Sequence, residues 1–140
     1  MWTYEVDVNW KSEKIGETHC AGKPVVEVAT PPEFGGPEGI WTPEDLLTSA
    51  VATCIMTSAL FFFNRSKINL KEYKSQAVGT LEKTPTGLLM TSIKVTANIA
   101  LEDATQADAA KKAMEQAEKT CPLSNSLTCP VSLDVNILNV

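Results

Sequence analysis

The uncharged stretch from Leu46 to Phe63 constrains the fold of this chain more than any other sequence feature. The residues just before it are typical of a helix start: a capping hydroxyl, a proline at the first helical position, and acidic side chains at the positive end of the helix dipole. These residues are Thr42, Pro43, Glu44 and Asp45. The pattern therefore predicts one long helix that is apolar on every side.

A helix of this kind is either the centre of a soluble protein or a membrane span. Serine and threonine recur along the stretch, and its length only reaches the roughly 18 residues that a membrane span needs. We therefore favour a soluble central helix over the membrane alternative. The residues after Met1 lack the basic and apolar regions of a signal peptide, so we expect a cytoplasmic protein.

Length and charge narrow the possible classes of function. The chain has 140 residues, which fits a single domain over 1–140. Its formal net charge is −5, and it has neither a run of basic residues nor more than one arginine. We expect no nucleic-acid or anionic-membrane partner, because nothing in this composition would neutralise phosphates.

Periodicity predicts the remaining elements. Alternating apolar residues indicate a half-buried strand over 2–10, two strands over 73–83 and 88–101 joined by a turn at 84–87, and a closing strand over 131–137. Strong helix formers predict an amphipathic helix over 104–119. The order strands, helix, strands, helix, strand indicates an α+β fold in which antiparallel sheet surrounds the central helix.

Four cysteines are candidates for chemistry: Cys20, Cys54, Cys121 and Cys129. Their wide spacing disfavours a disulfide scaffold, and the absence of Cys-x-x-Cys disfavours a zinc site, so we expect no metal. Cys54 lies mid-helix, where many free cysteines are simply small core residues. Cys121 lies at a helix end before Pro122 and is either a reactive thiol or a helix-end contact. We interpret Cys20 and Cys129 as half-buried small residues.

Two motifs far apart in the chain resemble the OsmC/Ohr family, the osmotically inducible and organic hydroperoxide resistance proteins. One is the helix start that leads to Cys54, and the other is the segment that follows Cys121. The loop before the helix matches as well. The motifs are Thr30-Pro31-Pro32-Glu33-Phe34-Gly35-Gly36, Thr42-Pro43-Glu44-Asp45-Leu46-Leu47 and Cys121-Pro122-Leu123-Ser124-Asn125-Ser126.

The resemblance implies an intertwined homodimer with its two active sites at the subunit interface. It implies that Cys54 attacks a small organic hydroperoxide and becomes a sulfenic acid, and that Cys121 resolves it to a disulfide for a dithiol reductant to reopen. No cofactor is implied. Glu44 would position a basic partner of the thiolate. Glu44 and Cys54 would be ~15 Å apart on one straight helix, so Glu44 would act from the other subunit.

The chain departs from this family at the basic partner itself. The resemblance implies an arginine in the N-terminal hairpin, but the single arginine here is Arg65, ~16 Å beyond Cys54 along the helix. The candidates to replace it are Lys11, Lys14, Lys23 and His19. Two functions therefore stay open. One is a cysteine-based hydroperoxide reductase, and the alternative is a weak or inactive OsmC-like dimer that binds a small apolar ligand.

Overall fold

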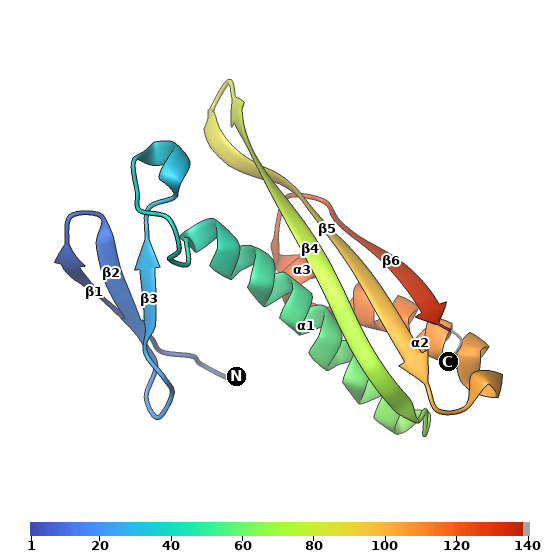
Figure 1. The fold of residues 1–140 in the computed structure, drawn as a ribbon. Helices are drawn as coiled ribbons and strands as arrows, with labels where there is room; N and C mark the ends of the chain where they lie inside the picture. The colour runs from blue at the N-terminus through green and yellow to red at the C-terminus, as the bar shows by residue number, and fades with distance from the viewer. Residues whose placement is uncertain (139–140) are drawn as a thin grey trace. The chain divides into compact units, whose positions relative to one another are not determined.

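The chain divides into two compact units, Met1–Leu46 and Leu47–Val140. The computed structural model describes residues 1–138. Helix α1 (Pro43–Arg65) begins in the first unit and runs through the second, as Figure 1 shows. The prediction of a single domain over 1–140 stays a prediction.

The N-terminal unit is a three-stranded antiparallel sheet of β1 (Asp7–Ser12), β2 (Ile15–His19) and β3 (Val26–Ala29) in that order. The predicted half-buried strand over 2–10 is wrong in two respects. The strand starts only at Asp7, and every residue of β1 is exposed. Its alternating apolar residues therefore lie open in the isolated chain, because no other described element covers them.

The loop between β3 and α1 is held by its own polar contacts. It contains the short 3-10 helix η1 (Pro32–Phe34). The Lys14 Nζ donates to the Phe34 carbonyl at 2.8 Å, and the Thr30 N–H donates to the Lys14 carbonyl at 3.1 Å. A Cβ added at Gly36 would overlap the Thr30 carbonyl oxygen, so only glycine fits this bend. The loop is therefore fastened to the β1–β2 turn.

Helix α1 starts as its sequence predicts. The Thr42 hydroxyl accepts from the Asp45 N–H at 3.1 Å, and the Asp45 carboxylate accepts from the Thr42 N–H at 3.0 Å. This is a reciprocal capping box with aspartate in the usual glutamate position. Pro43 occupies the first helical position, and Glu44 lies in the first turn. Two otherwise unpaired N–H groups are thus satisfied where the helix begins.

The C-terminal unit contains a second three-stranded sheet in the order β4 (Leu70–Thr84), β5 (Gly87–Leu101) and β6 (Val131–Leu138). Strands β4 and β5 form the predicted antiparallel hairpin. Strand β6 is parallel to β5, which corrects the expectation of purely antiparallel sheet. The chain leaves β5 through η2 (Ala104–Gln106), α2 (Ala107–Thr120) and α3 (Pro122–Ser126), and a helical crossover of this kind returns the next strand in parallel.

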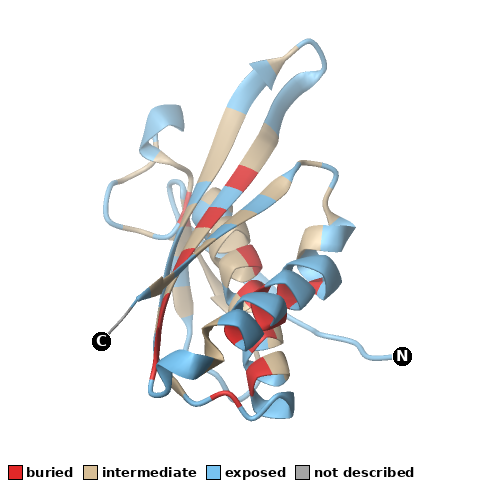
Figure 2. Ribbon diagram, turned by 90° about the vertical axis from the view of Figure 1, so that its right-hand side faces the viewer, coloured by how far each residue is buried: buried red, intermediate tan, exposed pale blue. Residues whose placement is uncertain are grey.

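Helices α1 and α2 lie on one side of this second sheet, and the buried residues gather between them and the strands (Figure 2). The core is contributed by α1, β5 and α2 together. Its fully buried members include Val51, Ile55, Ala59, Ile93, Val95, Ala97, Ile99, Ala110, Met114, Ala117 and Cys121. The α+β class predicted from the element order is confirmed.

The burial of α1 differs from its prediction. Its buried residues form one stripe along the helix, Val51, Ile55, Ala59 and Phe63, and 22% of its most apolar window is buried. The sheet of one chain covers one side of the helix and leaves Leu60 and Phe61 exposed. By length and composition alone α1 could cross a membrane, but the core helix of a soluble protein meets the same test.

Candidate active site

The structure brings the two predicted thiols together in the C-terminal unit. Cys54 lies in the middle of α1, and Cys121 lies between α2 and α3, with the two thiols close enough for each to shift the pKa of the other. The buried stripe of α2 ends in Cys121, which joins the same core as α1. Pro122 keeps Cys121 in an extended conformation with ψ of 113°, so α2 ends there as the sequence predicts.

Cys121 is fully buried and surrounded by donors. Burial raises the pKa of its thiol, but the hydroxyl and N–H of Ser124, followed by contacts with Cys54 and the Leu123 N–H, outweigh burial and lower the pKa below its ordinary value. The Ser124 hydroxyl is sealed from solvent and makes no well-aligned hydrogen bond within the described chain. Its approach to the Cys121 sulfur is therefore a polar contact of imperfect geometry.

Cys54 has the opposite character, because it is only partly buried and its thiol holds its proton more tightly. Burial raises its pKa most, the Leu123 N–H lowers it, and the neighbouring Cys121 sulfur raises it again. The Ser58 hydroxyl contributes a smaller lowering. Each sulfur shifts the pKa of the other, so the two thiols ionise as a pair.

Three of the four cations proposed to replace the arginine make contacts inside the N-terminal unit. Lys11 forms ion pairs with Glu17 at 3.1 Å and Glu27 at 3.3 Å, and hydrogen bonds to both carboxylates raise its pKa. The His19 Nε2 lies 3.4 Å from Glu17, and Lys14 holds the loop before α1. Their role beside a thiolate stays a prediction.

The other predicted site residues are placed as follows. Glu44 lies in the first turn of α1, and Arg65 is the last residue of that helix. Cys129 is partly buried against the core, as expected of a small packing residue, and Cys20 is partly buried after β2. Over residues 1–138 no group of three or more His, Cys, Asp or Glu side chains is arranged to hold a metal ion.

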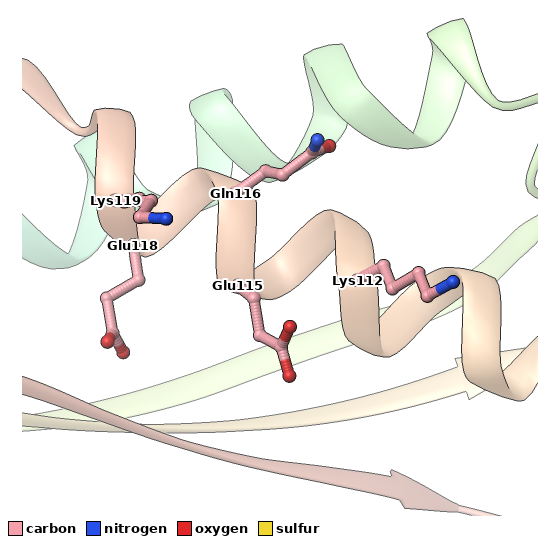
Figure 3. Close-up of a pocket in the computed structure, with 5 residues that line it drawn as sticks. All are labelled: Lys112, Glu115, Gln116, Glu118 and Lys119. Carbon is pink, nitrogen blue, oxygen red and sulfur yellow. The ribbon is translucent and has the colours of Figure 1, made fainter.

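A hollow of about 410 Å³ lies on the exposed side of α2 and not at the thiol pair. Figure 3 shows that its side chains come from this one helix and point in different directions. They are Lys112, Glu115, Gln116, Glu118 and Lys119. Binding sites for small molecules are mostly apolar with a few convergent polar groups, so this open charged surface is a poor candidate.

Comparison with known proteins identifies the family. Residues 36–136 match the family model described as OsmC-like protein. The chain belongs to the OsmC-like protein family. An uncharacterized protein of Acinetobacter baylyi is 29% identical over 115 residues, covering 81% of this chain and 77% of that protein.

Solved structures agree with this assignment at the level of the fold. An OsmC-like protein of unknown function from Vibrio cholerae superimposes with a TM-score of 0.89 at 18% identity, over 97% of this chain and 100% of the other. An organic hydroperoxide resistance protein from Elizabethkingia anophelis gives a TM-score of 0.76 at 20% identity, over 100% and 98% of the two chains. The predicted OsmC-like fold is thereby confirmed.

Sequence reasoning missed the neutral donors around the thiols. Ser58 follows Cys54 by one helical turn, a spacing that places two side chains on the same helix face and so could have revealed it. The Leu123 N–H faces both sulfurs, but a backbone group has no signature in the sequence. Its position depends on how α3 packs beside α1.

Proposed function

We propose that this OsmC-like protein is a cytoplasmic thiol peroxidase that reduces organic hydroperoxides through Cys54 and Cys121. The observation that carries the proposal is the contact between these two thiols, which come from distant parts of the sequence. The name of the Elizabethkingia anophelis protein of the same fold, an organic hydroperoxide resistance protein, supports the choice of substrate class.

The unequal exposure of the two cysteines supports an order of events. Cys121 is fully buried and Cys54 is partly exposed, so a peroxide reaches Cys54 first. The Cys121 sulfur, with the lower pKa, can accept the Cys54 proton as the peroxide enters. This transfer leaves the nucleophilic thiolate on the accessible cysteine.

The chemistry then balances in two steps. The Cys54 thiolate attacks the terminal peroxide oxygen, an S–O bond forms as the O–O bond breaks, and the released alkoxide takes up a proton to become the alcohol. Cys121 then loses its proton, and its thiolate attacks the sulfur of the resulting sulfenic acid. The disulfide forms as hydroxide leaves, and the hydroxide is protonated to water. A dithiol reductant then returns both cysteines to thiols.

We also propose that the active unit is a homodimer. The apolar residues of the N-terminal segment are exposed, from Trp2 at 87% to Trp10 at 77%, and Phe61 of α1 is 61% exposed. Apolar surface of this extent marks an interaction site. In such a dimer Glu44 of the partner subunit would orient the basic group beside Cys54, since it is too distant along its own helix.

One observation favours the alternative of a weak or inactive dimer that binds a small apolar ligand. The groups that lower the pKa of Cys54 are the Leu123 N–H and the Ser58 hydroxyl, both of them neutral. A thiol peroxidase normally relies on a cation beside its reactive sulfur. Whether neutral donors suffice decides between the two functions.

Intact-mass measurement after addition of one equivalent of cumene hydroperoxide tests the proposal. Loss of two hydrogen atoms, located by peptide mapping to Cys54 and Cys121, is the expected result. The Cys54→Ser variant should stay unmodified, and Cys121→Ser should stop at the sulfenic acid. Cys129→Ser, in which a cysteine outside the pair is removed, should behave as the unaltered protein does. Thiols that survive the peroxide intact would favour the ligand-binding alternative.

A further inference from the structure

Cys121 is the single residue between α2, which ends at Thr120, and α3, which begins at Pro122. Its backbone is extended, with φ of −60° and ψ of 113°, so the two helices meet at a corner there. Helix α3 has five residues, too few to be stable alone, and it needs anchors to the rest of the chain. The placement of the Cys121 side chain therefore depends on how α3 is held against α2.

Asn125 of α3 provides such an anchor through two hydrogen bonds. Its Nδ2 donates to the Lys119 carbonyl in the last turn of α2 at 3.0 Å. Its backbone N–H donates to the Cys121 carbonyl at 3.1 Å. One residue of α3 therefore bonds both to Cys121 and to the helix before it.

The carbonyl that the Asn125 side chain binds is one that the end of α2 leaves without its usual partner. In a continuing helix the Lys119 carbonyl would accept the N–H of Leu123, four residues later. The corner at Cys121 breaks this pattern, and the Asn125 amide takes the place of that N–H. The Asn125 side chain thus completes the end of α2 from the far side of the corner.

We propose that Asn125 is a positioning residue for Cys121, whose amide fixes the corner between α2 and α3 and so holds the Cys121 sulfur within reach of Cys54. The inference rests on the proposed function, in which Cys121 attacks the oxidised Cys54. A disulfide forms only within a narrow range of geometry, so a looser corner leaves the sulfur in place for less of the time. The hydrogen bond is exposed, so its loss affects the corner and spares the core.

The test measures the effective concentration of Cys121 toward Cys54 by thiol–disulfide exchange with β-mercaptoethanol and its disulfide. The Cys54 thiolate displaces one β-mercaptoethanol and forms a mixed disulfide, and the Cys121 thiolate then displaces the other. Peptide mapping after acid quenching gives the ratio of the two species. In Asn125→Ala the effective concentration should fall roughly two- to tenfold, the usual effect of one hydrogen bond.

Two further variants decide whether the amide itself acts. Asn125→Asp keeps the size of the side chain but offers the Lys119 carbonyl only acceptors, so the effective concentration should fall at least as far. Ser126→Ala is the matched control, because the Ser126 hydroxyl donates to the Pro122 carbonyl at 2.7 Å and this bond stays within α3. That variant should match the unaltered protein.

An effective concentration that is unchanged in Asn125→Ala would overturn the inference, as would an equal fall in Ser126→Ala or no fall in Asn125→Asp. Urea unfolding of each variant separates a displaced corner from loss of structure. The exchange needs no peroxide, so the two proposals fail separately. A fall in Asn125→Ala, in a protein that cumene hydroperoxide leaves untouched, would support the role of Asn125 and reject the peroxidase.

Discussion

At the scale of single residues, the two thiols differ because their donors are unequally shared. The hydroxyl and N–H of Ser124 serve Cys121 alone, whereas the Leu123 N–H is directed at both sulfurs. A negative charge on Cys121 therefore opposes ionisation of Cys54. The buried cysteine therefore raises the pKa of the accessible one.

This restraint predicts a change of reactivity in a variant without the buried thiol. In Cys121→Ala the neighbouring sulfur that raises the pKa of Cys54 is gone, so the alkylation profile of Cys54 should move to lower pH. Iodoacetamide alkylation over a series of pH values measures it. Cys129→Ala, which removes a cysteine outside the pair, is the matched control. A shift to higher pH would mean that Cys121 assists the ionisation of Cys54.

Tyr73 predicts an alkaline loss of stability. Its hydroxyl is buried in β4 with no hydrogen-bond partner among the described residues, and burial raises its pKa from 10.0 to about 12. The folded pKa is the higher one, so the unfolded chain loses the phenolic proton first. The part of the folding stability that depends on this proton is complete below pH 10.0, and it is lost as the pH rises toward about 12.

Tyr73→Phe should remove this part of the alkaline decline. At neutral pH it should raise the free energy of unfolding by about 1 kcal/mol, because an unpaired buried hydroxyl is costly. Urea unfolding at neutral and alkaline pH gives both quantities. Tyr4→Phe is the control, since Tyr4 is 91% exposed and is the chain's second tyrosine. Equal pH dependence in all three proteins would contradict the assignment.

At the scale of elements, α1 and β4 meet where β4 has no side chain. A Cβ added at Gly79 would overlap the Thr48 Oγ1 of α1 and lie 2.8 Å from the Met90 Cε of β5. The methionine can move aside, but the threonine is part of the helix face on the sheet. The absence of a side chain at Gly79 therefore allows the helix that holds Cys54 to pack closely against the strand.

Gly79→Ala should lower the free energy of unfolding by about 1–3 kcal/mol, the usual cost of overpacking. Thr48→Ala leaves the Thr48 Cβ 3.5 Å from the added atom, which is an ordinary contact. The double variant should thus be more stable than the sum of the two single effects predicts. A double-mutant cycle by urea unfolding measures this coupling, and strict additivity would show that the helix moves away instead.

The sequence predicted well those features that depend on side chains only a few residues apart. The cap formed by Thr42 and Asp45 and the turn before Gly87 follow from side-chain chemistry within a few residues. The parallel pairing of β6 depends on where the α2 crossover returns the chain. No periodicity within β6 carries that information. The approach of the two thiols was expected through the family resemblance, since the residues around Cys54 indicated a packing role and those around Cys121 left a reactive thiol and a helix-end contact equally open.

At the scale of the whole molecule, burial was the property that the sequence predicted least well. Alternation over 2–10 indicated a half-buried strand, and the absence of charge indicated a helix buried on every side. The structure of one chain leaves β1 exposed and covers only one stripe of α1. Apolar periodicity records that a surface is covered, but not whether the same chain covers it. Both differences are accounted for if a second copy provides the missing cover.

The dimer can be tested on β1, where neighbouring residues lie on opposite faces of the strand. Val8 is 68% exposed and belongs to the apolar face, and Asn9 is exposed on the other face opposite Glu17. A lysine at Val8 places a charge on the apolar face that the second copy would bury, which is unfavourable without a partner charge. A lysine at Asn9 adds the same charge beside a carboxylate.

Light scattering after size-exclusion chromatography should therefore give twice the 15.2 kDa chain mass for the unaltered protein and for Asn9→Lys. Val8→Lys should shift toward 15.2 kDa at the same concentration. If the active site needs Glu44 of the partner subunit, peroxide-driven oxidation of Cys54 should fall with the dimer and return as the Val8→Lys concentration is raised. An unaltered protein that elutes as a monomer would reject the dimer and, with it, the role of Glu44 across subunits.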